Sequence, residues 1–279
     1  IRYAQNENVD RGDLRMQVIE RGTSTPIDDA KISISYSGDP DSTVEEVNTD
    51  ASGMSETLTL DTPPLELSMQ PSEVQPYAEY TIQVTAKGYR PINISGIEVF
   101  SGQLSLQEIR MDAEKATESM TDNIVIPAHT LFAEYPPKIA EAEIKPVTET
   151  GEIVLSRVVI PEYVIVHDGA PSDPTARDYY VRYRDYIKNV ASSEIYSTWP
   201  DATIRANVLA IMSFTLNRVY TEWYRNKGYS FTITSSTAYD QKFMYGRNIY
   251  QSISDVVDEM FQNYLSRPNV RQPILTQYC

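Results

Sequence analysis

The sequence predicts an α+β protein of two parts, an N-terminal antiparallel β-sandwich followed by a mostly helical α+β domain. Apolar and polar residues alternate between residues 12 and 112, prolines interrupt the chain between 113 and 160, and apolar residues recur at helical spacing after 161. A chain of 279 residues is long enough for about two domains. We therefore expect a tail (1–11), a sandwich domain (12–112), a linker (113–160) and a second domain (161–279).

Period-two alternation predicts the strands of the first part. The stretch DLRMQVIE places Leu14, Met16 and Val18 on one face, and AKISISY and YTIQVTA repeat the pattern. Gly-Asp, Ser-Gly and Lys-Gly pairs supply turns between them. About seven short strands at this spacing indicate a small β-sandwich. The stretches PIDDAKISI, TDASGMSETLTL and YTIQVTAKGYRPINISGIEVF resemble the transthyretin-like or carboxypeptidase-regulatory-like sandwich, a fold that is usually a spacer or docking module.

The linker is predicted from its prolines. AEKATESMTD favours a short charged helix, and Pro136, Pro137 and Pro146 follow it. Proline stiffens the chain and removes hydrogen-bond donors, so an extended segment is expected there. Such segments are accessible to proteases. We place a processing cut, if one occurs, between residues 145 and 157.

Composition and charge narrow the classes of function. The net charge is −15, and residues 1–150 hold 26 acidic and 11 basic side chains, so the excess lies in the first half. This balance argues against a nucleic-acid or anionic-membrane partner, and no apolar run of about 20 residues is present to span a bilayer. One cysteine, Cys279, and two histidines offer no zinc-ligand spacing. We expect neither a metal nor a cofactor.

The second part carries the helical pattern. EYVIVH predicts a short buried strand that ends at His167, and YSFTITSST predicts another. A helix is expected over 184–195, a long one from Asp201 to Lys227, where Gly228 follows, and a last one over 249–266. In the first of these, Tyr186, Val190 and Glu194 are spaced by four residues, so they share one face.

Glu194 is the candidate catalytic residue. It can be a capping or salt-bridged carboxylate near a helix end, and composition alone favours that interpretation. Its position on an apolar face favours a catalytic carboxyl instead. Burial disfavours the ionised form of a carboxyl and keeps it protonated near neutral pH. A protonated carboxyl is the state that a general acid requires.

A resemblance weighs for the second interpretation. YIKNVASSEIYSTWPDATIRANVLAIMSFTL, which begins at Tyr186, resembles the signature of the stage II sporulation protein D family, also called the amidase-enhancer or LytB-type family. The spacing from Glu194 to Trp199-Pro200 agrees without gaps. AYDQKFMYG resembles the family's later Gln-Val-Tyr-x-Gly stretch. Within the family, the sequence is most similar to the clostridial spore cortex-lytic enzymes, in which a propeptide precedes the catalytic part.

The resemblance implies a lytic transglycosylase of peptidoglycan, a secreted zymogen acting in spore cortex or cell wall of a Firmicutes bacterium during germination. Glu194 would protonate the glycosidic oxygen between N-acetylmuramic acid and N-acetylglucosamine. As a carboxylate it would then take the proton of the muramyl 6-hydroxyl, which closes a 1,6-anhydro ring. The substrate supplies its own nucleophile, so one protein carboxylate suffices where ordinary glycosidases need two. The implied partners are peptidoglycan glycan strands and an activating protease at the linker.

Further candidates would bind the substrate. Aromatic rings stack on sugars, and polar or cationic side chains would complete the site; the candidates are Tyr196, Tyr239, Gln241, Tyr245, Lys188 and Arg205, with Ser235 and Ser236 as weaker ones. The family has an arginine where this chain has Met212. Arg205, two turns earlier on nearly the same helical face, can substitute for it, and we interpret the apolar residue as a feature of the cortex-lytic subfamily.

Two other functions stay open from the sequence. An N-acetylmuramoyl-L-alanine amidase would cleave the stem peptide instead, although such hydrolases usually hold zinc. A non-catalytic wall-binding or assembly protein would use the acidic sandwich and would not need Glu194. The family continues past the position of Cys279 with a second active-site segment, so we expect more chain to follow it. The sequence does not predict the oligomeric state.

Overall fold

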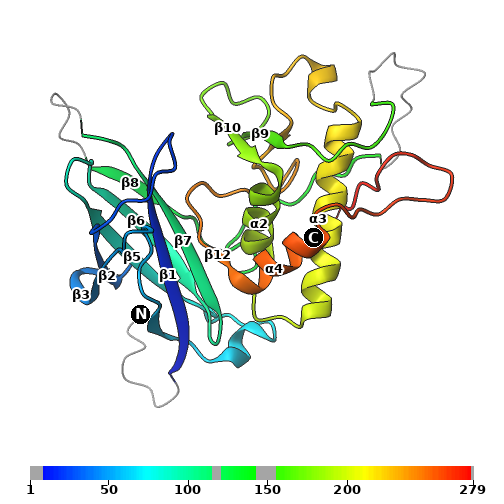
Figure 1. Ribbon diagram of the computed structural model, residues 1–279. Helices are drawn as coiled ribbons and strands as arrows, with labels where there is room; N and C mark the ends of the chain where they lie inside the picture. The colour runs from blue at the N-terminus through cyan, green and yellow to red at the C-terminus, as the bar shows by residue number, and fades with distance from the viewer. Residues whose placement is uncertain (1–8, 115–120, 143–154, 278–279) are drawn as a thin grey trace. The chain divides into compact units, whose positions relative to one another are not determined.

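The computed structural model describes residues 9–114, 121–142 and 155–277 (Figure 1). The chain forms two compact units. Unit 1 consists of Ile1–Ala128, Tyr196–Trp199 and Tyr245–Ser252, and unit 2 of His129–Ile195, Pro200–Met244 and Ile253–Cys279. Two short segments from the second half of the sequence therefore belong to the first unit. The predicted boundaries did not include this exchange.

Unit 1 contains a β-sandwich, as predicted. One sheet has the strand order β12-β7-β1-β4 and the other β3-β2-β5-β6-β8. The strands are β1 (Asp10–Glu20), β2 (Lys31–Tyr36), β3 (Asp39–Asn48), β4 (Leu58–Thr62), β5 (Ala78–Thr85), β6 (Ile92–Val99), β7 (Leu104–Met111), β8 (Asp122–Val125) and β12 (Ile249–Tyr250), with a 3₁₀ turn at Leu65–Ser68. The sheets are not purely antiparallel, because β1 runs parallel to β7 and β6 parallel to β8.

The alternation in the sequence marks the core of the sandwich correctly. Leu14, Met16 and Val18 on β1 are fully buried, as are Ile82 and Val84 on β5. Burial of this kind contributes about 1.5–3 kcal/mol for each large apolar side chain. The period-two pattern therefore fixed which face of each long strand turns inward.

Strand β8 lies inside the predicted linker, so the sandwich extends further than expected. Asp122–Val125 pairs with β6 over the register Ile92↔Asp122 to Ser95↔Val125. Only Ile126, just past the strand, is buried, while Val125 is 74% exposed. A four-residue edge strand with so few buried side chains leaves no alternation to detect.

Strand β12 lies where the last helix was predicted to begin. Ile249↔Leu106 and Tyr250↔Ser105 pair it with β7, and helix α4 (Gln251–Met260) starts only afterwards and ends six residues earlier than expected. Glu98 explains why β12 is held against β7. Its carboxylate is fully buried and pairs with the guanidinium of Arg247. The side-chain amide of Asn248 donates to the Glu98 carbonyl at 2.8 Å. A buried charge needs such partners.

Unit 2 combines a three-stranded sheet with helices. The sheet has the order β10-β9-β11, and its strands are β9 (Tyr163–His167), β10 (Asp178–Arg182) and β11 (Ile233–Thr234). Helix α2 (Tyr183–Glu194) packs against helix α3 (Asp201–Tyr220), and the part of α4 from Ile253 onward also belongs to this unit. None of the described helices is both long and apolar enough to cross a membrane.

Helix α3 ends seven residues before the predicted Lys227. Glu222 has a left-handed backbone with φ of 47°, which ends the helix. Lys227 instead belongs to a 3₁₀ turn, Arg225–Lys227, which Gly228 closes with φ of 86°. Glycine accepts that conformation without strain. The Lys-Gly signal thus marked a real chain reversal, but of the following turn.

Residues 129–142 were predicted to be linker and instead pack into unit 2. The backbone N–H of Ile139 donates to the Ala238 carbonyl at 2.7 Å, and the carboxylate of Glu141 pairs with the guanidinium of Arg218. Arg218 is only 1% exposed, and a buried guanidinium needs carboxylate partners. The predicted charged helix and most of the predicted cut region lie outside the described residues.

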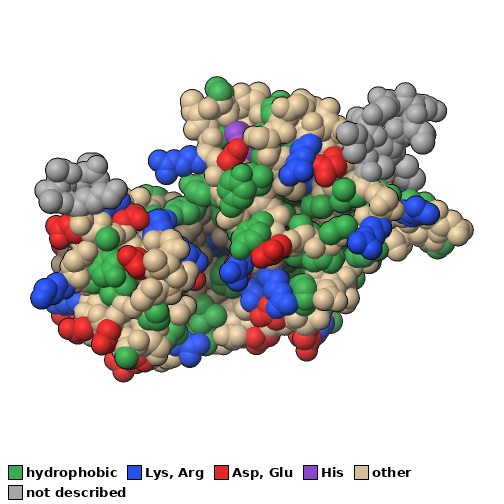
Figure 2. Space-filling view, turned by 45° about the horizontal axis from the view of Figure 1, so that its top comes forward, with side chains coloured by type: hydrophobic (Ala, Val, Ile, Leu, Met, Phe, Trp, Pro, Cys, Tyr) green, Lys and Arg blue, Asp and Glu red, His purple; other side chains and the backbone are tan. Residues whose placement is uncertain are grey.

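On the face shown in Figure 2, acidic and basic side chains are interspersed over the described surface.

Candidate functional site

Glu194 is the last residue of helix α2 and is partly buried. Tyr186 and Val190, which share its face, are fully buried. A helix C-terminus carries partial negative charge and therefore disfavours a carboxylate. Here the backbone N–H of Lys242 donates to Glu194 Oε1 at 2.7 Å, a charge-assisted hydrogen bond that offsets this effect.

The segment Gln241–Met244 is fixed against α2. The side-chain amide of Asn189 donates to the Met244 carbonyl at 2.8 Å and accepts from the Met244 N–H at 2.9 Å. Two of the resembling stretches, 48 residues apart in the chain, are thereby brought together at Glu194. Both hydrogen bonds of Asn189 are buried, so they determine the direction in which the Lys242 N–H points.

Gln241 is fully buried and holds the same segment from inside. Its Oε1 accepts from the Tyr186 hydroxyl at 3.2 Å and from Thr215 Oγ1 at 2.7 Å, and its Nε2 donates to the Ile211 carbonyl at 3.0 Å. A side chain with no exposed surface and both amide ends occupied positions its neighbours. Gln241 therefore positions its neighbours in unit 2, whereas the sequence predicted a direct substrate contact for it.

Lys242 supplies the cation of the site. Burial lowers its pKa, and the carboxylates of Asp168 and Glu194 partly oppose that shift. Its ammonium lies 5.4 Å from the centroid of the Tyr135 ring. A lysine held among two carboxylates and an aromatic ring stabilises negative charge at Glu194. Neither Lys242 nor Asp168 was among the predicted residues.

Asp168 reaches this cluster because of the sheet. It follows the end of β9, and β11 runs parallel to β9 with Thr234 opposite His167. The carboxyl ends of parallel strands meet at one edge of a sheet, so Ser235 comes next to Asp168 and its hydroxyl donates to Asp168 Oδ1 at 2.7 Å. The weaker candidate Ser235 is therefore 3% exposed and serves this carboxylate.

The other predicted residues have different surroundings. Lys188 pairs with Asp258 at 2.7 Å. Arg205 pairs with Asp201 at 2.7 Å and with Glu259 at 2.5 Å. It is thus held by one acid on its own helix and one on α4. A cation whose charge does act with that of Glu194 is Lys242. Met212, which stands where the signature that this chain resembles has an arginine, is fully buried.

Two of the predicted tyrosines belong to unit 1. Tyr196 is 8% exposed, with its ring 5.2 Å from that of Phe100 and 5.8 Å from that of Trp199. The Tyr245 hydroxyl accepts from Arg21 at 2.6 Å. Both side chains have protein partners within the sandwich unit. Tyr239, by contrast, is 38% exposed and lines a cavity of unit 2.

His167 has the structural place that the sequence predicted. It is the last residue of β9, its Nδ1 lies 2.7 Å from Asp178 Oδ1, and its ring stacks on Phe231 at 4.4 Å. Within the described residues no group of three or more His, Cys, Asp or Glu side chains is arranged to hold a metal ion.

No family model and no curated protein matches this chain. Solved structures resemble only part of it. The Bacillus anthracis TIE protein is 15% identical over 37% of this chain and 17% of its own length, with a TM-score of 0.26. Klebsiella pneumoniae 5-hydroxyisourate hydrolase is 17% identical over 37% of this chain and 92% of its own, with a TM-score of 0.25. Catechol 1,2-dioxygenase from Pseudomonas arvilla is 13% identical over 42% and 56%, with a TM-score of 0.26. These scores are too low to carry an inference about activity.

Proposed function

We propose that this chain is a peptidoglycan lytic transglycosylase of the stage II sporulation protein D type, with Glu194 as its general acid and base. The observation that carries the proposal is the partly buried Glu194 carboxyl, held by the Lys242 N–H at 2.7 Å and accompanied by the partly buried charges of Lys242 and Asp168. The sequence resemblance supplies the substrate class.

The mechanism uses one protein carboxyl in two steps. Protonated Glu194 gives its proton to the glycosidic oxygen as the bond from that oxygen to the muramyl C1 breaks. The resulting carboxylate takes the proton of the 6-hydroxyl while O6 bonds to C1, so the enzyme returns to its starting state. Lys242 and its N–H stabilise the carboxylate between the steps, because both favour negative charge at Glu194.

The same proposal assigns a role to each of the two units. Unit 2 would be the catalytic α+β domain and the sandwich of unit 1, transthyretin-like in kind, an inhibitory or chaperoning prosegment of a secreted zymogen. A protease acting between residues 145 and 157 would activate it in the spore cortex or cell wall. The assignment is motivated by the cortex-lytic enzymes that the sequence resembles, in which a propeptide precedes the catalytic part.

Glu194→Gln tests the proposal. We expect a roughly 100- to 10,000-fold loss of cortex lysis by the complete protein, since the proton donor is removed, while the fold and glycan binding persist. Mass spectrometry of digested cortex should find 1,6-anhydro-muramyl ends with the wild type. Glu162→Gln, an exposed glutamate of unit 2, is the matched control and should keep full activity.

Other outcomes have defined meanings. Free stem peptides in place of anhydro ends would show an amidase and refute the glycan chemistry. Unchanged activity of Glu194→Gln would refute the assigned residue. Peptidoglycan binding without any bond cleavage, equal in wild type and variant, would instead identify a wall-binding protein.

A further inference from the structure

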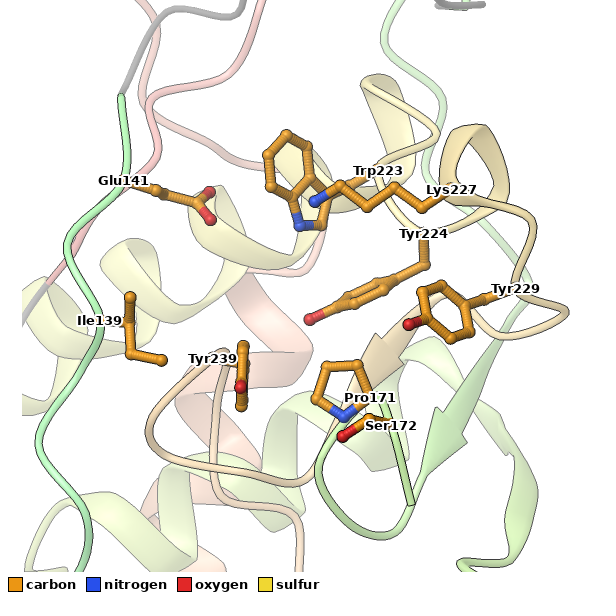
Figure 3. A pocket seen from close by; sticks show the side chains of 9 residues that line it. All are labelled: Ile139, Glu141, Pro171, Ser172, Trp223, Tyr224, Lys227, Tyr229 and Tyr239. Carbon is orange, nitrogen blue, oxygen red and sulfur yellow. The ribbon is translucent and has the colours of Figure 1, made fainter. Parts of the chain in front are cut away.

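A cavity of about 310 Å³ in unit 2 is lined by four aromatic rings (Figure 3). These rings belong to Trp223, Tyr224, Tyr229 and Tyr239, and three of them follow the end of helix α3 within nine residues. Tyr229 and Tyr239 are 36% and 38% exposed. Ligand pockets begin at about 300 Å³, so this cavity has room for a single ring-sized group.

Charges around the rings disfavour a cationic ligand. The ammonium of Lys227 lies 3.0 Å from the centroid of the Trp223 ring, and the guanidinium carbon of Arg218 lies 5.1 Å from the same ring and 5.9 Å from the Tyr224 ring. The ring electrons that would attract a cation already interact with two cations of the protein. An added cation would also be repelled by them.

Hydroxyl groups in the cavity wall can form hydrogen bonds with the polar edge of a ligand. The side-chain hydroxyls of Tyr229, Tyr239 and Ser172 donate to and accept from none of the described residues in this structure. The Tyr224 hydroxyl is already committed, since it donates to Asp240 at 2.6 Å. The cavity therefore combines apolar ring faces with hydroxyls and, at the wall, the carboxylate of Glu141.

We propose that this cavity binds one pyranose unit of a glycan. A pyranose has an apolar face of C–H groups that stacks on an aromatic ring, and a rim of hydroxyls that bonds to hydroxyl and carboxylate groups. A phosphate would be attracted by Lys227 in the same wall, so adenosine monophosphate is included in the test as the competing ligand. Glu194 and Lys242 do not line the cavity, so the assignment stands on its own lining whether or not Glu194 is catalytic.

Isothermal titration calorimetry of the full chain with the trimer of N-acetylglucosamine tests the proposal. We expect saturable binding that Tyr239→Ala and Tyr229→Ala each weaken about tenfold, or about 1.4 kcal/mol, because each variant removes a ring on which the sugar stacks. Tyr229→Phe, which removes only the hydroxyl, serves where truncation disturbs the packing of Tyr229 on Phe231. Tyr180→Ala is the control, because Tyr180 is 75% exposed on β10 and outside the cavity.

Trp223 reports where the sugar binds. The chain has two tryptophans, so a saturable fluorescence change in wild type that disappears in Trp223→Phe places the sugar at this cavity. Glu194→Gln should bind the sugar as the wild type does, and the Tyr229, Tyr239 and Trp223 variants separate the cavity from the catalytic proposal. An absence of saturable binding overturns the inference, and so does binding to the Tyr229 and Tyr239 variants as tight as to the wild type. Loss of sugar binding in Glu194→Gln also overturns it. The same holds if tetramethylammonium or adenosine monophosphate binds at Trp223 more tightly than the sugar does.

Discussion

At the scale of single residues, the chemistry of Glu194 depends on what faces it at the end of its helix. The helix C-terminus disfavours a negative carboxylate, and the Lys242 N–H at 2.7 Å together with the charge of Lys242 favours it. General acid–base chemistry at Glu194 passes through its carboxylate, and the charge of Lys242 stabilises that form. The side chain of Lys242 is therefore the residue to vary.

Lys242→Met should lower activity roughly 100-fold by removing a charge beside the developing carboxylate. Burial lowers the pKa of Lys242 below the usual 10.5, so the wild type should lose activity on the alkaline side at a pH below 10.5 as this ammonium deprotonates. Lys242→Arg stays charged and should lack that alkaline decline. The pH profile of cortex lysis by the three proteins measures this.

Deprotonation of Lys242 is expected to raise the stability of the folded protein, although it lowers activity. The folded state favours the neutral amine, so the cost of burying the charge is fully present below the folded pKa of Lys242 and is relieved as pH rises toward 10.5. Unfolding of this site therefore does not explain an alkaline loss, and circular dichroism at each pH separates the two causes. An alkaline decline in Lys242→Arg equal to that of the wild type would contradict the role given to Lys242.

The sequence predicted half of this site, for a physical reason. Glu194, Tyr186 and Val190 lie within one helix, so spacing alone places them on one face. Lys242 reaches Glu194 through the tertiary contacts of Gln241–Met244, and Asp168 comes near Lys242 through the β9–β11 pairing. A lysine and an aspartate next to turns look like ordinary surface residues in a sequence, and the one available signal was the neighbouring Gln241.

At the scale of elements, the segment Gln241–Met244 positions the site through Asn189. Asn189→Ala would leave the buried N–H and C=O of Met244 without their partner, at a cost of about 1–3 kcal/mol in the free energy of unfolding. We expect faster amide hydrogen exchange at residues 241–244 and a loss of activity with Glu194 itself unchanged. Exchange measured by mass spectrometry reports on the segment directly.

Asn207→Ala is the matched control for this variant. Among the described residues, the side chain of Asn207 donates only to the Thr203 carbonyl of its own helix, so its loss should change stability by about 0.5 kcal/mol or less. If Asn189→Ala has the same amide exchange rates at residues 241–244 and the same activity as Asn207→Ala, other contacts hold the segment. The positioning role of Asn189 is then wrong.

The elements differ in how well the sequence predicted them, according to their length and burial. Long strands such as β1, with Leu14, Met16 and Val18 buried, carry enough alternation to be recognised. β8 and β12 contain four and two residues, and they form because partners elsewhere in the chain are available. The early end of α3 depends on the left-handed Glu222, which local propensity does not predict.

At the scale of the whole molecule, the two units exchange segments across the proposed cut. Residues before it (129–142) belong to unit 2, where Glu141 pairs with the buried Arg218. Residues after it (245–252) belong to unit 1, where β12 pairs with β7. Neither unit is therefore encoded by one continuous stretch, and a prosegment cannot leave without breaking buried ion pairs and strand pairing.

A protease site inserted between residues 145 and 157 tests this consequence. We expect the two fragments of the cut protein to elute together from a size-exclusion column, because removing one partner of a buried ion pair costs about 3–5 kcal/mol. They should separate in guanidinium chloride, which serves as the control for complete cleavage. If the zymogen proposal holds, cortex lysis should rise on cutting while the fragments stay associated, since freeing the chain at the cut would then suffice for activation. Spontaneous release of the N-terminal fragment in native buffer would contradict the exchange of segments, and equal lysis by cut and uncut protein would refute the prosegment role even if the fragments remain together.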